Sequence, residues 1–325
     1  MILRVGLLGL GGIGARHAAA IGQLGDRMRL VACCGRDPDR TAGFAGRFVA
    51  APFTNFDRML TEAKLDLLIV ALPPYAHDGE VEAAARAGIH LLVEKPIALD
   101  LDRATAMLAA SQSVVAACGF MYRFGAAVTR WDALAAAGST GRAGHFSGSF
   151  HSNALHAPWW RSRAQSGGQM VEQLIHIVDL ARHTLGMPQT VYARAANLFH
   201  AAVPGYDSED VSAIILGYED GRIGLLHASN AAVPGRWAKQ WQIVASEMTG
   251  IFSDFNTAEL VTTHGDMRSE HIAGNIDPFV AQLADLADAV VQHRPPRVPL
   301  TEGAATLRIV LAARQSADEQ REITL

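Results

Sequence analysis

The sequence predicts an α/β protein in which a doubly wound parallel sheet precedes an α+β domain with a large, mainly antiparallel, open sheet. Three observations lead to this fold class. Up to about residue 120, short continuous Val/Ile/Leu runs alternate with helical patterns, as buried parallel strands and their covering helices do. A glycine-rich turn follows the first run. After Phe124 the rhythm changes to segments typical of antiparallel strands.

The size and composition fit two globular domains. The chain has 325 residues, of which 50% are hydrophobic and 18% are charged, so it can bury a substantial core. The net charge of −4 provides no overall field that would attract nucleic acid or anionic lipid. We therefore expect a small-molecule substrate and neither a nucleic-acid nor a membrane partner.

The first half contains five apolar runs and five helical patterns. The runs that predict parallel strands are Leu3–Leu8, Leu30–Cys34, Leu67–Leu72, His90–Val93 and Val114–Cys118. The helical patterns between them are Ala15–Leu24, Pro38–Arg47, Phe56–Ala63, Asp78–Ala87 and Leu101–Ala110. Residues 1–121 are therefore expected to form one dinucleotide-binding type of domain.

The second half, residues 122–325, is expected to form an α+β domain with a mainly antiparallel sheet. The predicted strands are Ala143–Ser152, Thr190–Leu198, Val211–Tyr218, Arg222–Ala228, Gln240–Ser246 and Gly250–Phe255. The predicted helices are Ala126–Ala137, Gln169–Leu185, Pro278–His293 and Glu302–Gln315. Asp220-Gly221 lies between two of the strands and predicts a hairpin turn.

Cysteine usage and hydropathy indicate the compartment. The three cysteines, Cys33, Cys34 and Cys118, are too few for a disulfide scaffold, and no CxxC pair suggests structural zinc. No apolar run approaches the length of about 18 residues that a membrane span needs. Arg16 and His17 interrupt the only stretch that resembles a signal peptide. We expect a cytoplasmic protein.

The glycine-rich turn has the pattern of a phosphate-binding loop. Gly9-Leu10-Gly11-Gly12-Ile13-Gly14 is a GxGxxG motif between a predicted strand and an alanine-rich helix, the context that this motif requires. Gly9 permits the tight turn, Gly11 permits close approach of a pyrophosphate, and Gly14 lets the helix pack on the strand. The unpaired N–H groups of the helix N-terminus would face the phosphates. A glycine turn without a ligand is the alternative.

The end of the second predicted strand indicates which dinucleotide binds. An NAD-binding strand usually ends in a carboxylate that holds the ribose 2′-OH, but here the strand leads into Gly35-Arg36-Asp37-Pro38. Asp37-Pro38 is typical of a helix N-cap followed by Pro at the first helical position. Arg36 would attract a 2′-phosphate, which favours NADP(H) over NAD(H). The alternative is that Arg36 is solvated and Asp37 turns back to the ribose.

Several short motifs follow in a characteristic order. They are the glycine loop, Pro73-Pro74-Tyr75-Ala76-His77, Glu94-Lys95-Pro96, Gly119–Phe124, Gly167-Gly168, and a predicted helix that carries an acid and a histidine four residues apart. In this combination the chain resembles the Gfo/Idh/MocA oxidoreductase family over nearly its whole length.

The resemblance implies that residues 1–121 form a dinucleotide-binding Rossmann domain. It implies that residues 122–325 form a substrate-binding and oligomerisation domain built on a large open antiparallel sheet. It also implies a nicotinamide cofactor and a sugar, polyol or inositol-like substrate. It implies that Lys95 and His176 serve the reacting carbon and that Glu172 stands where the family usually has Asp. It also implies a homo-oligomer, a dimer or tetramer, with the open sheet as the interface. The implied cofactor-binding residues are Gly9, Gly11, Gly12, Ile13, Gly14, Arg36, Pro73, Pro74, His77, Glu94 and Lys95.

The residues themselves support the role of Lys95. It follows the carboxyl end of a predicted parallel strand, where open α/β sheets bind ligands. A positively charged nicotinamide ring nearby would lower its proton affinity, so that it could donate a proton to a carbonyl oxygen. Pro96 fixes the exit of the chain and is a candidate for a cis bond. The alternative is a surface lysine paired with Glu94.

The predicted helix Gln169–Leu185 presents a polar stripe beside its core face. Glu172, His176, Asp179 and His183 fall within about 60° of arc. His176 could accept the hydroxyl proton during oxidation of a carbinol, and Glu172 could bind a second hydroxyl. Asp179 and His183 are expected to continue a solvated face. A metal site is the competing interpretation, but the spacing is not HExxH.

Further residues are candidates for the substrate pocket, since aromatic rings stack on sugars and arginines bind hydroxyls or carboxylates. The candidate substrate-binding residues are Tyr122, Arg123, His151, Trp160, Arg161, Glu172 and His176. The predicted function is hydride transfer between nicotinamide C4 and a secondary alcohol or ketone. The alternative is a non-catalytic NAD(P)-binding sensor or regulator with the same fold.

Overall fold

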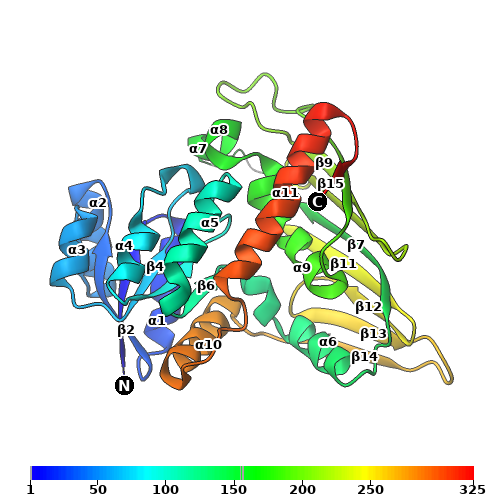
Figure 1. Cartoon of the computed structure of the whole chain (residues 1–325), viewed down its shortest axis with the longest axis horizontal. Coiled ribbons are helices and arrows are strands. Elements are labelled where there is room, and N and C mark those ends of the chain that lie inside the picture. The colour runs from blue at the N-terminus through cyan, green and yellow to red at the C-terminus, as the bar shows by residue number, and fades with distance from the viewer. Residues whose placement is uncertain (1, 154, 156) are drawn as a thin grey trace. The chain divides into compact units, whose positions relative to one another are not determined.

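The computed structural model describes residues 2–153, 155 and 157–325. The chain divides into two compact units (Figure 1). The first consists of Met1–Met121 and Asp277–Ala304, and the second of Tyr122–Ile276 and Ala305–Leu325. The predicted second domain, 122–325, differs from this division because residues 277–304 return to the first unit.

The first unit contains a six-stranded parallel sheet. Its strands are β1 (Leu3–Leu8), β2 (Met28–Cys34), β3 (Ala51–Phe53), β4 (Leu67–Val70), β5 (His90–Val93) and β6 (Ala116–Cys118). The order β3-β2-β1-β4-β5-β6 is that of a Rossmann sheet, which confirms the predicted architecture. The sequence analysis missed β3, a short strand at the edge of the sheet.

Helices cover the central strands of this sheet. They are α1 (Gly12–Gln23), α2 (Pro38–Phe48), α3 (Phe56–Glu62), α4 (Glu80–Arg86), α5 (Leu101–Ala110) and α10 (Pro278–Gln292). Phe279 and Leu283 of α10 belong to the same buried core as Leu3, Val5 and Leu7 of β1. Burial of this apolar face explains why α10 belongs to the first unit.

The second unit contains a nine-stranded sheet with the order β14-β13-β12-β11-β7-β10-β9-β8-β15. The strands are β7 (Ala143–His151), β8 (Thr190–Ala196), β9 (Val211–Gly217), β10 (Ile223–Ser229), β11 (Ala238–Ala245), β12 (Met248–Phe252), β13 (Thr257–Thr262), β14 (Ser269–Ala273) and β15 (Ile323–Thr324). All neighbours are antiparallel except β7 and β10. Gly221, with φ of 84°, forms the predicted turn between β9 and β10.

The helices of the second unit are α6 (Ala126–Ala136), α7 (Pro158–Arg161), α8 (Arg163–Ser166), α9 (Ile175–Leu185) and α11 (Leu300–Glu319), of which α11 begins in the first unit. Helix α9 packs on β7 and β10 (Figure 1). A π-helical segment, Met170–Leu174, precedes α9, so the predicted helix Gln169–Leu185 is present but does not have one regular period.

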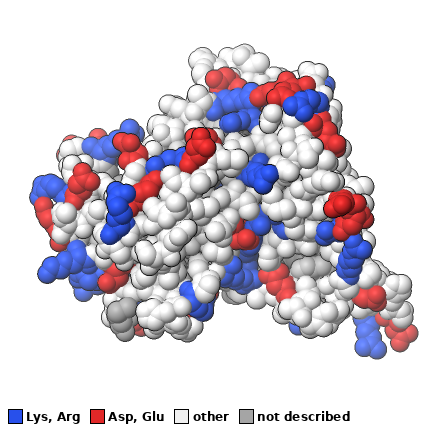
Figure 2. All heavy atoms as spheres, viewed as in Figure 1, with Lys and Arg blue, Asp and Glu red and all other residues white. Residues whose placement is uncertain are grey.

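The surface carries charges of both signs. On the face shown in Figure 2, Lys and Arg side chains are interspersed with Asp and Glu side chains and form no continuous basic stripe. Within the described chain, no helix has the length and apolar character needed to cross a membrane.

Candidate active site

The glycine loop joins β1 to α1 by a turn that only glycine fits at two positions. Gly9 has φ of +95°, and a Cβ there would lie 2.4 Å from the carbonyl oxygen of Ala71. A Cβ on Gly14 would lie 2.2 Å from the carbonyl oxygen of Gly9. In contrast, Gly11 and Gly12 are exposed and have open space where a Cβ would be. The loop therefore leaves its backbone accessible at the helix N-terminus, as a bound pyrophosphate requires.

The end of β2 has no room for an acidic side chain. A Cβ on Gly35 would lie 2.7 Å from Thr41 Oγ1 and 2.9 Å from Leu10 Cδ1. The carboxylate of Asp37 accepts a hydrogen bond from the backbone N–H of Arg40 at 2.8 Å, which confirms its predicted role as the N-cap of α2. Arg36 is exposed beside this cap.

The loop after β4 is held by its histidine. Pro74–Ala76 forms a 3₁₀ turn, and the nearly buried His77 ring forms a hydrogen bond through Nδ1 with the Glu80 carboxylate. The backbone N–H of Asp78 donates to the other Glu80 oxygen at 2.7 Å. Burial raises the pKa of Glu80, but the hydrogen bonds from His77 and Asp78 outweigh it and leave the pKa below its ordinary value.

The segment after β5 carries Lys95 next to a buried carboxylate. Glu94 Oε1 lies 2.6 Å from Nε2 of the fully buried His17 of α1. Glu94 Oε2 accepts a hydrogen bond from the backbone N–H of Lys95 at 3.2 Å, and the Lys95–Pro96 bond is cis. A Cβ on Gly119 would lie 2.6 Å from the same carboxylate. Glu94 is thus fixed on several sides, and it holds the backbone from which the half-buried Lys95 side chain leaves.

All candidate cofactor-binding residues therefore follow the carboxyl ends of β1, β2, β4 and β5 in the first unit. Ligands of open α/β sheets bind at this edge, where the order of the strands reverses.

In the second unit, the π-helical segment and α9 carry Glu172 and His176. The indole N–H of the buried Trp160 donates to Glu172 Oε2 at 2.5 Å. The ring of His176, which is 5% exposed, lies 4.6 Å from the ring of Tyr122 and 6.4 Å from that of Phe150. The structure thus brings together four of the predicted substrate residues: Tyr122, Trp160, Glu172 and His176.

Buried polar side chains fix the start of this helical segment. Gln169 Nε2 donates to Asn230 Oδ1 at 2.9 Å and to the carbonyl oxygen of Asp210 at 3.2 Å. Gln173 Nε2 donates to the carbonyl oxygen of Phe150 at 3.2 Å. Glu209 Oε1 accepts the backbone N–H of Met170 at 2.8 Å, and burial raises the pKa of this carboxyl.

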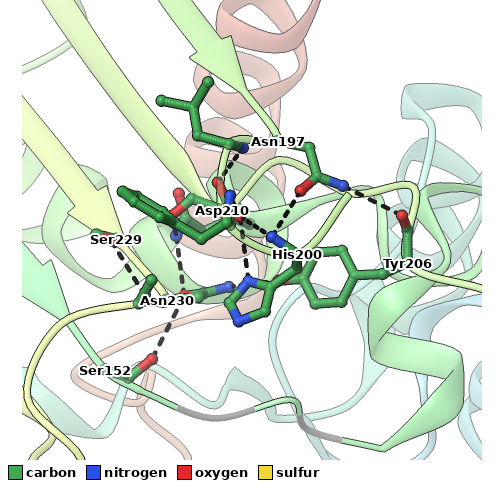
Figure 3. A network of polar contacts seen from close by, with 11 residues as sticks. Ser152, Asn197, His200, Tyr206, Asp210, Ser229 and Asn230 are labelled. Atoms are coloured by element: carbon green, nitrogen blue, oxygen red, sulfur yellow. Dashed lines mark hydrogen bonds and ion pairs between the residues drawn. The ribbon is translucent and has the colours of Figure 1, made fainter. Parts of the chain in front are cut away.

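The polar network that joins Gln169, Asn230 and Asp210 extends to the loop between β8 and β9 (Figure 3). The Asp210 carboxylate accepts the backbone N–H groups of Leu198, Phe199 and His200 at 2.7–2.8 Å. Further along the same loop, the backbone N–H groups of Asp207 and Ser208 donate to the carbonyl oxygen of Arg161 at 3.1 Å. The β8–β9 loop therefore also supports α7, which carries Trp160 and Arg161.

Arg123 and Asp179 have structural roles. Arg123, which is 2% exposed, donates two hydrogen bonds to the Asp179 carboxylate at 2.6 and 2.7 Å. Thr306 Oγ1 donates to the same carboxylate at 3.1 Å. The expectation that Asp179 lies on a solvated face is wrong, because this paired carboxylate is buried.

Two other histidines lie apart from His176. His183 Nε2 pairs with Asp132 at 2.9 Å. The ring of His151 lies 5.1 Å from that of His227, on the sheet face opposite Phe150, since successive strand residues point to opposite faces. The structure therefore does not group His151 with the other predicted substrate residues. Within the described residues, no group of three His, Cys, Asp or Glu side chains is arranged to hold a metal ion.

The sequence analysis missed one cluster next to His176. Trp237 directly precedes β11, Lys239 is the second residue of that strand, and Phe255 follows β12. Lys239 and Phe255 contact the ring of Tyr122, and Trp237 contacts Phe150. No motif marks these positions, because only the pairing of β7 with β11 brings them to the site.

Fold and site together define an oxidoreductase with an NAD-binding Rossmann domain. Residues 3–120 match the family model described as "Oxidoreductase family, NAD-binding Rossmann fold", and residues 128–251 match the model of the GFO/IDH/MocA C-terminal domain. The chain belongs to the Gfo/Idh/MocA oxidoreductase family, as the order of its motifs predicts.

Individual relatives are similar over their whole length. Inositol 2-dehydrogenase of Rhizobium meliloti (strain 1021) is 28% identical, with 100% of both chains covered. Among solved structures, levoglucosan dehydrogenase in complex with NADH and L-sorbose has a TM-score of 0.92 at 19% identity, covering 100% of this chain and 99% of that one. A putative NADPH-dependent oxidoreductase from Desulfitobacterium hafniense DCB-2 has a TM-score of 0.88 at 21% identity, covering 99% and 97%.

The glycine loop gives a prediction with an internal control. Gly14→Ala should lower the melting temperature and weaken NADPH binding, because the new methyl group would collide with the backbone of Gly9. Gly22→Ala in the same helix meets open space and should keep binding and stabilise the protein slightly. Thermal melts and fluorescence titration with NADPH measure both effects. Equal behaviour of the two variants would contradict this account of the loop.

Proposed function

We propose that the protein is an NADP(H)-preferring oxidoreductase that acts on a secondary alcohol or ketone of a sugar, polyol or inositol-like molecule. The observation that carries the proposal is that Lys95 follows a strand of the dinucleotide-binding sheet, while Glu172 and His176 share one helical segment with aromatic side chains around them. The inositol and levoglucosan dehydrogenases named above act on molecules of this type.

A bound nicotinamide dinucleotide supplies the group that accepts or donates the hydride. In the oxidation direction, His176 takes the proton of the substrate hydroxyl as the carbinol becomes a carbonyl. Lys95 donates a hydrogen bond to the same oxygen, which stabilises the developing charge. Glu172, oriented by the Trp160 indole, accepts a hydrogen bond from a second hydroxyl and so orients the ring.

This mechanism predicts a loss of turnover without a loss of nucleotide binding. Lys95→Met and His176→Ala should each lower kcat by about 10²–10⁴-fold, the usual contribution of general acid–base catalysis. The dissociation constant of NADPH should change little. Lys64→Met and His183→Ala, at residues outside this site, are the matched controls. Rates near the wild-type value in both test variants would refute the proposed roles.

The preference for NADP(H) rests on Arg36. Gly35 leaves no side chain at the tip of β2, and the Asp37 carboxylate is engaged in the helix cap. The residue between them, Arg36, has an exposed guanidinium that can bind a 2′-phosphate. The remaining candidate cofactor residues are the glycine loop, Pro73, Pro74, His77 and the Glu94–Lys95 pair.

Arg36→Ala should weaken NADPH binding by about 10- to 100-fold, the value of a charge-assisted hydrogen bond. NADH binding should change by much less, because NADH lacks the 2′-phosphate. Arg86→Ala, at an exposed arginine that is the last residue of α4, is the control. Fluorescence titration of the wild-type protein and both variants with each nucleotide gives the six dissociation constants. An equal loss for both nucleotides would remove the argument for NADP(H).

A non-catalytic sensor with the same fold is the alternative that this proposal replaces. A sensor needs a nucleotide site, but it needs neither a lysine at the tip of β5 nor a histidine beside the aromatic cluster. We also propose a cytoplasmic location, since Cys33, Cys34 and Cys118 are buried free thiols that suit a reducing compartment.

We further propose a homo-oligomer that pairs through the nine-stranded sheet. Ile215 of β9, Leu225 of β10 and Ile251 of β12 are each 43–45% exposed and lie on the same face of the sheet, and an apolar sheet face of this kind favours association. Light scattering should therefore give the mass of a dimer or tetramer. Ile215→Lys with Leu225→Lys should shift the mass toward the monomer. A monomeric wild-type protein would refute the assembly.

A further inference from the structure

Lysine is rare in this chain. Lys64, Lys95 and Lys239 are the only lysines among its 28 Lys and Arg residues. Lys64 is exposed on the first unit, and Lys95 belongs to the proposed catalytic machinery. Lys239 has no role in the proposed mechanism, although it lies beside the aromatic side chains around His176. A lysine provides a compact ammonium with three donors, which an arginine does not.

Aromatic rings surround the ammonium of Lys239. Its Nζ lies 5.6 Å from the ring centroid of Tyr122 and 5.5 Å from that of Phe255. Its hydrogen bond to the carbonyl oxygen of Trp237 is long, at 3.4 Å. Among the residues that the structure describes, this hydrogen bond uses one of the three ammonium donors. The other two donors remain for a ligand.

The same rings contact His176. The ring of Tyr122 lies 4.6 Å from that of His176 and 5.0 Å from that of Phe255. Phe150, the strand partner of Lys239, also contacts His176, and its ring lies 6.0 Å from Trp237. The half-exposed Trp237 indole adds a flat apolar surface suited to the C–H face of a sugar. Lys239 and His176 thus both lie beside the ring of Tyr122.

No protein carboxylate within the described residues forms an ion pair with Lys239. Asp254 acts on it only from a distance, and one Asp254 oxygen already accepts the backbone N–H groups of Asn256 and Thr257 at 2.7 and 2.9 Å. Glu172 is hydrogen-bonded to Trp160. Burial lowers the pKa of Lys239 in spite of Asp254. A half-buried cation that lacks a close counter-charge favours a ligand that provides one.

We propose that Lys239 is a specificity-determining residue that binds a carboxylate of the substrate. The substrate class is then a polyhydroxy acid, such as a uronic or aldonic acid, whose carboxylate lies apart from the carbinol at His176. This inference rests on the proposed function but adds the charge of the substrate to it.

The test compares matched acids and neutral sugars on the NADPH complex, in which an alcohol cannot be oxidised. D-Glucuronate is paired with D-glucose, and D-gluconate with D-glucitol, in calorimetric titrations of the wild-type protein. The variants are Lys239→Met, Lys239→Arg and the control Lys64→Met. Thermal melts check that each variant is folded.

We expect the acids to bind the wild-type protein and the Lys64→Met control at least about 10-fold more tightly than their neutral partners. Lys239→Met should remove this preference, which weakens the acids by about 10- to 100-fold, while the neutral sugars change little. Lys239→Arg should keep part of the preference, because it keeps the charge.

Equal binding of acids and neutral sugars by the wild-type protein would overturn the proposal, as would an equal loss of both in Lys239→Met. Failure of every acid to bind at millimolar concentrations would also overturn it. These outcomes differ from failure of the proposed function, which would appear as absent NADPH binding or as turnover that survives in Lys95→Met and His176→Ala.

Discussion

The parallel direction of the six-stranded sheet is the constraint on which the first unit depends. Because every strand runs the same way, the glycine loop, Arg36, the Pro73–His77 turn and Lys95 all leave the sheet at one edge. Gly9 and Lys95 are 86 positions apart in sequence. The strands that they follow, β1 and β5, are nevertheless separated only by β4. Loop sequence then determines the chemistry, and close packing explains where loop residues must be small: Gly9, Gly14 and Gly35 each lie against atoms that a Cβ would overlap.

The second unit positions its functional side chains by a different means. Its antiparallel sheet provides a platform, but the helical segment with Glu172 and His176 is fixed on it by buried amides and carboxylates, mainly Gln169, Gln173 and Glu209. Buried polar groups cost free energy unless they are satisfied, so such contacts define one position of the helix better than apolar packing alone. The buried pair of Arg123 and Asp179 adds a second fixed point one turn beyond His176.

Local sequence patterns predicted most of the elements because the apolar runs and caps are local signals. Leu101–Ala110 and His90–Val93 have the predicted bounds, and Asp37 caps its helix as predicted. The edge strand β14 was missed because Ser269–Ala273 is mostly exposed and lacks an apolar pattern. The sequence analysis also did not predict β13 (Thr257–Thr262) or the two-residue β15 (Ile323–Thr324). Two further differences involve long-range partners. Asp179 was expected in solvent because its partner Arg123 lies 56 residues away in sequence. Helix α10 was assigned to the second domain because the pattern of an amphipathic helix does not specify which of two sheets the helix covers.

One departure from the family pattern is explained by its neighbour in space. The resemblance leads one to expect Asp where this chain has Glu172, and sequence alone leaves the effect of the longer side chain open. In the structure the Glu172 carboxylate accepts the indole N–H of the buried Trp160. The contact ties α7, which carries Trp160 and Arg161, to the helical segment of His176, so the extra methylene joins two predicted substrate-binding segments. A shorter Asp would reach the indole only if α7 or the helical segment moved, which makes Glu172 and Trp160 a matched pair.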